Sequence, residues 1–166
     1  MCNMVRYIFS DFALHTSHLK MYYLFDYWSI NRKIIFMEQN GKVQFNEQLR
    51  ERTMNLAAEV RDLLKSKIIS SIDRPILQQI IRSSSSVAAN YRSATRGRSD
   101  AEFYSKLCIV VEECDETKFW LDYLVRLRVL NESETEVLRD EAEQLVRLFA
   151  SIKRTMKEKI EKNRNV

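Results

Sequence analysis

Candidate chemistry in this 166-residue chain centres on three acidic residues and one arginine: Glu113, Asp115, Glu116 and Arg82. Neighbouring carboxylates can bind a metal ion or act together as an acid and a base. A di-iron bundle would also need Glu-x-x-His motifs on two helices, and the two histidines, His15 and His18, lack a third ligand at suitable spacing. No glycine-bearing loops frame a cleft for a small-molecule substrate. These missing features predict that the protein is not an enzyme and holds no metal or cofactor.

The same charged residues are better explained as a structural network. If the chain reverses direction near Arg98, Arg82 lies opposite residue 114 and faces all three carboxylates. Paired charges are how such groups tolerate partial burial. Asn90 lies on the apolar face of the same expected helix, where a lone amide usually fixes helix register, and ligand binding is its alternative role. We therefore predict a structural polar network of four residues: Arg82, Asn90, Glu113 and Glu116.

Basic side chains form two further groups, in a chain whose net charge is +4. We predict nucleic-acid contacts from six of them: Arg92, Arg96, Arg98, Lys153, Arg154 and Lys157. Such clusters can contact the phosphates of RNA or DNA, but no aromatic side chain lies between the arginines to read bases. The alternative is a basic face that pairs with acids of a neighbouring subunit.

The elements that position these residues are predicted to be helices. Only two glycines and one proline are present, which are too few to make the turns of a sheet. A hydrophobic content of 45% is enough for one core in a chain of this length. Apolar residues from Leu49 to Leu63 recur at helical spacing and predict a helix over about 46–68. The fold class is therefore expected to be all-α.

The stretch RSSSSVAANYRSATRGRSDAEFYSKL contains four consecutive serines. We expect them inside a second helix over about 75–96, which starts at Pro75 after Asp73, because the apolar period continues through them to Ala94. Serine hydroxyls can bond carbonyls in the preceding turn, and small side chains allow close helix packing. A flexible linker, the alternative, would leave the preceding isoleucines exposed. Gly97 is predicted to end this helix as a left-handed cap.

Two capping boxes predict the remaining helices. Ser99 and Glu102 match the S-x-x-E pattern and predict a third helix over about 100–130. Asn131 and a similar pattern, Ser133 to Glu136, predict the start of a fourth helix over about 133–162. Because the connections are short, neighbouring helices should be antiparallel. We predict an antiparallel up-down-up-down four-helix bundle.

The expected third helix has hardly any polar face over residues 119–127. A helix that is apolar nearly all round must be covered on both sides, by its own bundle and by a neighbour. We therefore predict an oligomer interface that includes Phe119, Trp120 and Tyr123.

The first 36 residues differ from the rest. They hold nine of the seventeen aromatic residues and show no sustained helical period. We expect residues 1–36 to be an extension upstream of Met37, and 37–166 to form the bundle; an arm docked on a hydrophobic groove is the alternative. No secretory signal or membrane-spanning run is visible. Together with cysteines that cannot pair locally, this predicts a cytoplasmic protein.

The segment RSSSSVAANYRSATRGRSDAEFYSKLCIVVEECDETKFWLDYL resembles the hairpin of the four-helix-bundle proteins related to the 23S rRNA intervening-sequence proteins. That family also resembles the accessory protein of diversity-generating retroelements, which works beside a reverse transcriptase. The resemblance implies an α-bundle, usually a homopentamer, with nucleic-acid binding through basic surfaces. Many family members carry a Glu-Gly pair where this chain has Ser93 and Ala94, so no role of that glutamate is expected here.

Two functions follow from these features. The first is a non-catalytic bundle that self-assembles into a homo-oligomer and presents a surface to a macromolecular partner. The second is an accessory protein that binds RNA or DNA through its basic surface.

Overall fold

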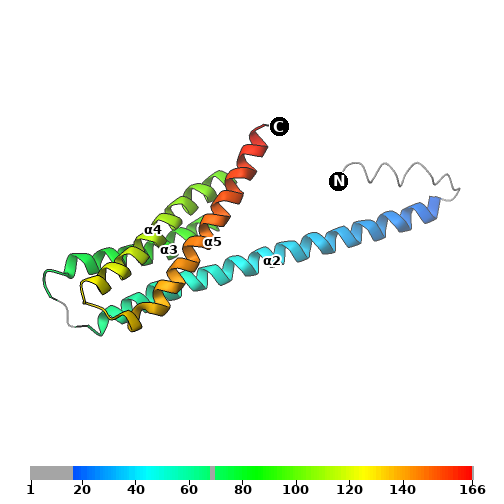
Figure 1. Ribbon diagram of the computed structural model, residues 1–166. Helices are drawn as coiled ribbons and strands as arrows, with labels where there is room; N and C mark the ends of the chain where they lie inside the picture. The colour runs from blue at the N-terminus through cyan, green and yellow to red at the C-terminus, as the bar shows by residue number, and fades with distance from the viewer. Residues whose placement is uncertain (1–16, 68–69, 166) are drawn as a thin grey trace. The chain divides into compact units, whose positions relative to one another are not determined.

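The computed structural model describes the backbone of residues 17–67 and 70–165, and side chains from residue 40 onward. The described residues form four helices and no strand: α2 (Ser17–Lys65), α3 (Arg74–Ala94), α4 (Asp100–Arg126) and α5 (Glu132–Arg164) (Figure 1). The expected all-α class is confirmed. The chain divides into two units, Met1–Gln44 and Phe45–Val166, and the functional residues below belong to the second.

The helix α2 begins at Ser17, far before the expected start near residue 46. The expectation followed the apolar period, which reports a face that packs against other elements. Once a helix is nucleated it can extend by one backbone hydrogen bond per residue without a packed face, and Gly41 is the only glycine or proline between residues 17 and 65. The residues before 46 therefore form a helix although they lack the apolar repeat of a packed helical face. Residues 1–16, including His15, lie outside the described part of the chain.

All four helices contribute to one hydrophobic core in the second unit. Its buried side chains include Leu49, Leu56, Val60, Ile80, Val87, Leu107, Leu121, Leu124, Leu145 and Phe149. The ring of Tyr91 also lies in this core, with its centroid 4.9 Å from that of Phe149. Helix α2, which begins the second unit, and helix α5, which ends it, thus pack against the same apolar core. Burial of this apolar surface supplies most of the favourable folding free energy of such a bundle.

Ion pairs between α4 and α5 run in opposite order along the two helices. Asp100, the first residue of α4, pairs with Lys159 at 2.7 Å, and Lys118, about two-thirds of the way along α4, pairs with Glu143 at 3.2 Å. The same order holds between α2 and α5, since Arg52 pairs with Glu141, and Lys67, two residues past the end of α2, pairs with Glu134. This order is consistent with the expected up-down-up-down arrangement.

The serines of the sequence RSSSS lie inside α3, as predicted. Asp73 stands at the N-cap and Pro75 in the first turn, although the Asp73 side chain makes no capping hydrogen bond. The predicted left-handed cap at Gly97 is wrong, because no glycine in the described residues has a positive φ. Short-range bonds close the helix instead: the backbone N–H of Gly97 donates to the Ala94 carbonyl at 2.9 Å.

The start of α4 is as predicted, because the Glu102 backbone N–H donates to Ser99 Oγ at 3.1 Å. The end is not, since α4 stops at Arg126, about four residues early. Arg128 there adopts φ 59°, and the N–H of Val129 donates to the Leu124 carbonyl at 3.0 Å. This is a Schellman ending with arginine at a position that usually holds glycine.

The predicted capping box at 133–136 is also wrong. Helix α5 begins one residue earlier, at Glu132, and its capping box joins Asn131 to Glu134. The N–H of Asn131 donates to the Glu134 carboxylate at 3.3 Å. Thr135, inside the mistaken box, is buried, so packing of this turn against the core favours the earlier start. Within the described ranges, no helix is both long and apolar enough to cross a membrane.

Candidate functional site

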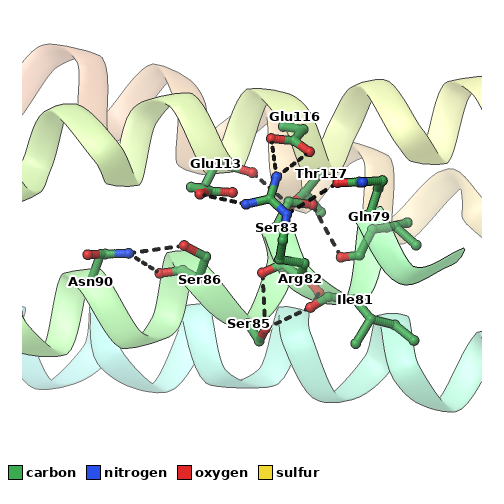
Figure 2. A network of polar contacts seen from close by, with 12 residues as sticks. Gln79, Ile81, Arg82, Ser83, Ser85, Ser86, Asn90, Glu113, Glu116 and Thr117 are labelled. Carbon is green, nitrogen blue, oxygen red and sulfur yellow. Dashed lines mark hydrogen bonds and ion pairs between the residues drawn. The ribbon is translucent and has the colours of Figure 1, made fainter. Parts of the chain in front are cut away.

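Arg82 joins α3 to α4 through two carboxylates, an arrangement we call the arginine clasp (Arg82, Glu113 and Glu116) (Figure 2). One guanidinium nitrogen, Nη2, donates to both oxygens of Glu116 at 2.7 and 2.8 Å. The other, Nη1, donates to Glu113 Oε1 at 3.3 Å. Nε donates to Gln79 one turn earlier on α3 at 3.2 Å. The structure thus brings together three of the four residues predicted to form the polar network.

The clasp lies at the edge of the bundle, and its contacts favour the charged forms of Arg82 and Glu116. The side chain of Arg82 is 52% exposed, whereas those of Glu113 and Glu116 are 14% and 31% exposed. The Glu116 carboxylate has a pKa below its ordinary value, because the indole N–H of Trp120 and then Arg82 stabilise the charge against the opposing effect of burial. Hydrogen bonding to Glu116 likewise raises the pKa of Arg82.

A pair of hydroxyl groups lies between the same two helices. Thr117 Oγ1 is 3.0 Å from Ser83 Oγ, and both side chains are fully buried. Ser83 donates to the Ile80 carbonyl at 3.2 Å, and Thr117 lies 2.8 Å from the Glu113 carbonyl. The serines lie in the helix as expected, but the pairing of Ser83 with Thr117 was not predicted. Small hydroxyl residues on two facing apolar stripes were the available signal.

Asn90 and Asp115 do not join the clasp. The Asn90 amide donates to the carbonyl and the hydroxyl of Ser86, both at 3.0 Å, because it lies two turns from Arg82 on the same helix (Figure 2). Asp115 is exposed and makes no ion pair with another described residue. The expectation that Arg82 faces three carboxylates, and that Asn90 belongs to its network, is therefore corrected to two carboxylates without the amide.

The predicted interface residues form an aromatic cluster on α4 (Phe119, Trp120 and Tyr123). The Phe119 ring stacks on the Tyr123 ring at 5.9 Å between centroids, with 7° between their planes. Trp120 meets both rings edge on, at 4.9 Å and 5.9 Å. Phe119 is 54% exposed, and Trp120 packs against the core on its inner side. The cluster is thus ordered by its own contacts, with Phe119 exposed and Trp120 and Tyr123 half-buried.

The two basic groups lie at the same end of the bundle. Lys159 of α5 pairs with Asp100, the first residue of α4, which directly follows the turn that holds Arg96 and Arg98. Five of the six predicted basic residues are exposed, and Lys153 is half-buried. Lys157 pairs with Glu161 at 3.9 Å, and the other five make no ion pair within the described residues. Two sequence groups more than fifty residues apart therefore share one surface region.

A second polar group, which sequence analysis missed, ties α2 to α3. The buried Tyr91 hydroxyl is 3.2 Å from Asn46 Oδ1, and Arg50 donates to Thr95 Oγ1 at 2.9 and 2.7 Å. Burial raises the pKa of Tyr91 to about 12. Each of these residues fits a helical pattern, but nothing local in the sequence indicates that a hydroxyl of α3 meets an amide of α2.

The described residues carry no group of three or more His, Cys, Asp or Glu side chains that could hold a metal ion. Burial raises the pKa of the Cys114 thiol to about 12, so this cysteine stays protonated and unreactive at neutral pH. Cys108 is a free thiol and half-buried. The arginine clasp accordingly has the features of an interhelical ion pair.

Four helices that share one apolar core make this chain an all-α helical-bundle protein. The family model of the 23S rRNA-intervening sequence proteins matches residues 46–151, and the chain belongs to this family. The resemblance drawn from the hairpin is confirmed.

A solved structure agrees with this assignment. It is a crystal structure of a protein of unknown function from the S23 ribosomal protein family of Bacteroides thetaiotaomicron. The two chains are 26% identical, with a TM-score of 0.55, and the match covers 63% of this chain and 96% of the other. A comparison with curated proteins gave no match.

Proposed function

We propose that this protein is a non-catalytic, cytoplasmic helical bundle that assembles with copies of itself and presents a surface to a macromolecular partner. The observation that supports the proposal is the aromatic cluster of α4. Fully burying an exposed aromatic side chain stabilises an interface by about 1.5–3 kcal/mol, and Phe119 is 54% exposed, while Trp120 and Tyr123 are half-buried and extend the apolar surface around it.

Charge along the same helix favours a second copy of the chain as that partner. Exposed acids precede the cluster on α4, and exposed arginines follow it: Glu112, Asp115, Arg126 and Arg128. A second copy brings both signs of charge and the same aromatic rings to the contact. Complementary charge of this kind guides association and disfavours other partners. The proposed assembly is a closed homopentamer, a number that rests on the family resemblance.

The mass of the full-length protein in solution tests this proposal, measured by sedimentation velocity over a range of concentrations. Phe119→Ala and Trp120→Ala should shift the mass toward monomer while helix content is kept. Val137→Ala is the matched control, because Val137 is 73% exposed but lies alone on α5. A monomeric wild-type protein would contradict the proposal.

A second candidate function is binding of RNA or DNA phosphates at the basic end of the bundle. The Lys159–Asp100 ion pair supports it, because it places the basic part of α5 beside the α3–α4 turn. Basic side chains brought together from two elements contact a polyanion better than either group alone. Binding of the full-length protein to structured RNA and to duplex DNA over a salt series tests this function. Absence of binding at low salt would rule it out.

A further inference from the structure

One carboxylate links the arginine clasp to the aromatic cluster. Glu116 Oε1 accepts a hydrogen bond from Arg82 Nη2 at 2.7 Å and another from the indole Nε1 of Trp120 at 2.9 Å. Glu116 and Trp120 are one turn apart on α4, whereas Arg82 belongs to α3. The orientation of an aromatic ring at the surface therefore depends on a residue of another helix.

Trp120 is the central ring of the cluster. It meets Phe119 at 70° and Tyr123 at 67°, both of which are edge-on geometries. A different rotamer of the indole would lose both contacts and the bond to Glu116. Phe119 and Tyr123 stack on each other, but their outward position beside Trp120 depends on where its ring lies. Holding this one indole consequently sets the shape of the exposed surface.

Arg82 is the cation that keeps Glu116 in place. Glu113 Oε2 is buried and has no hydrogen-bond partner among the described residues, so its carboxylate depends on the single bond from Arg82. Without the guanidinium, two neighbouring carboxylates on α4 would repel each other. Glu116, the more exposed of the two, would turn toward water and release the indole. The exposed charge of Arg82 thus acts on a side chain that it does not touch.

We propose that Arg82 is a positioning residue for self-assembly: through Glu116 it holds Trp120 in the orientation that a second copy of the chain contacts. The inference rests on the proposed function, in which the aromatic cluster is the interface. Arg82 need not touch the second copy, so its effect on assembly would be indirect. A role limited to fold stability would leave the orientation of Trp120 and the assembly constant unchanged.

The test uses the full chain with Trp28→Phe, so that Trp120 is the remaining tryptophan, labelled as 5-fluorotryptophan. Arg82→Gln should shift the fluorine resonance and raise the dissociation constant of the assembly about tenfold, the loss of roughly one hydrogen bond to a charged group. Arg82→Lys should restore assembly in part, because a lysine cannot bind a carboxylate through two nitrogens. Arg61→Gln is the control, since Arg61 pairs only with its neighbour Asp62.

The outcomes separate this inference from the proposed function. If Trp120→Ala dissociates the assembly while Arg82→Gln matches wild type in mass and resonance, the inference is wrong and the interface stands. A shifted resonance with an unchanged assembly constant also overturns it. If Trp120→Ala leaves the mass unchanged, the proposed function itself fails. Circular dichroism checks that each variant is folded. If Arg82→Gln does not fold, Arg82→Lys takes its place in both measurements.

Discussion

The hydroxyl oxygen of Thr117 lies 3.0 Å from that of Ser83, and neither side chain is exposed to solvent. The pair joins α4 to α3 directly beside the arginine clasp (Figure 2). A shift of either helix by one residue would bury a hydroxyl without its partner, which costs about 1–3 kcal/mol. The buried pair and the clasp therefore favour the same register of the hairpin.

A double-mutant cycle should detect this pair. Ser83→Ala and Thr117→Val each remove one hydroxyl with little change in volume, and each should lower the free energy of unfolding by about 1 kcal/mol. The double variant should lose less than the sum of the two, because the second change removes a group that has already lost its partner. Urea unfolding measures all four proteins. Additive losses would show that the hydroxyls do not interact.

The Glu116 carboxylate makes part of the stability depend on pH. Its pKa in the folded protein is below the ordinary value, so its stabilising effect is complete above the unfolded pKa of about 4.3. The effect is lost as the pH falls through the folded pKa. The difference in melting temperature between wild type and Glu116→Gln should be constant from about pH 7 to 5 and shrink below about 4.3. The exposed Glu112→Gln serves as the control, and the same decrease there would contradict the assignment.

The end of α4 offers a stabilising substitution. Arg128 has φ 59°, where a side chain is disfavoured and glycine is not. Arg128→Gly should raise the free energy of unfolding by about 1 kcal/mol, because the Schellman bonds keep their geometry while the strain is relieved. Arg126→Gly, two residues earlier and inside the helix, should have the opposite sign at about the same size. A loss of stability in both variants would show that the ending of α4 is not left-handed in solution.

The hairpin of α3 and α4 was predictable because its signals are local. Pro75 and the Ser99–Glu102 box define the helix starts. Counting residues from the turn placed Arg82 opposite Glu113, Asp115 and Glu116, and the two glutamates do pair with it. The position of Asn90 did not follow, since an amide can bond its own helix as well as another. The spacing of residues in the sequence tells on which face of a helix a side chain lies. Which of several hydrogen-bond partners that side chain takes depends on distances between the two helices.

The errors arose where two local patterns compete or where packing decides. Both 131–134 and 133–136 fit a capping box, and the burial of Thr135 is a tertiary feature that the sequence does not display. The early start of α2 was missed because amphipathic spacing was taken as the sign of a helix. The bond between Tyr91 and Asn46 was missed for a similar reason, as it joins residues 45 positions apart.

Residues 1–36 are predicted to be dispensable for folding of the second unit. Among the residues of α2 whose side chains are described, the first that bonds another helix is Asn46, through the Tyr91 hydroxyl. Deletion of residues 1–36 should therefore change the melting temperature by only a few degrees. Asn46→Ala, which removes the acceptor of a buried hydroxyl, should lower stability by about 1 kcal/mol in both the full-length and the shortened protein. A large decrease on deletion would instead support a docked arm.

The basic end of the bundle gives the most direct test of nucleic-acid binding. If Arg92, Arg96 and Arg98 contact phosphates, changing all three to Ala should weaken binding to RNA and DNA without altering any sequence preference. The logarithm of the affinity should also depend less on salt, by roughly 0.7–0.9 in slope for each phosphate contact that is lost.

A matched variant separates this local effect from the loss of net charge. Three exposed arginines elsewhere can be changed to Ala with the same change in charge: Arg61, Arg74 and Arg147. This control should reduce affinity slightly, through the overall field, and leave the salt slope as in wild type. If both triple variants behave alike, the basic end has no specific role. If the Arg92, Arg96 and Arg98 variant binds normally but assembles poorly, these arginines pair with acids of a neighbouring subunit, the alternative that fits their exposure and their lack of an ion pair among the described residues.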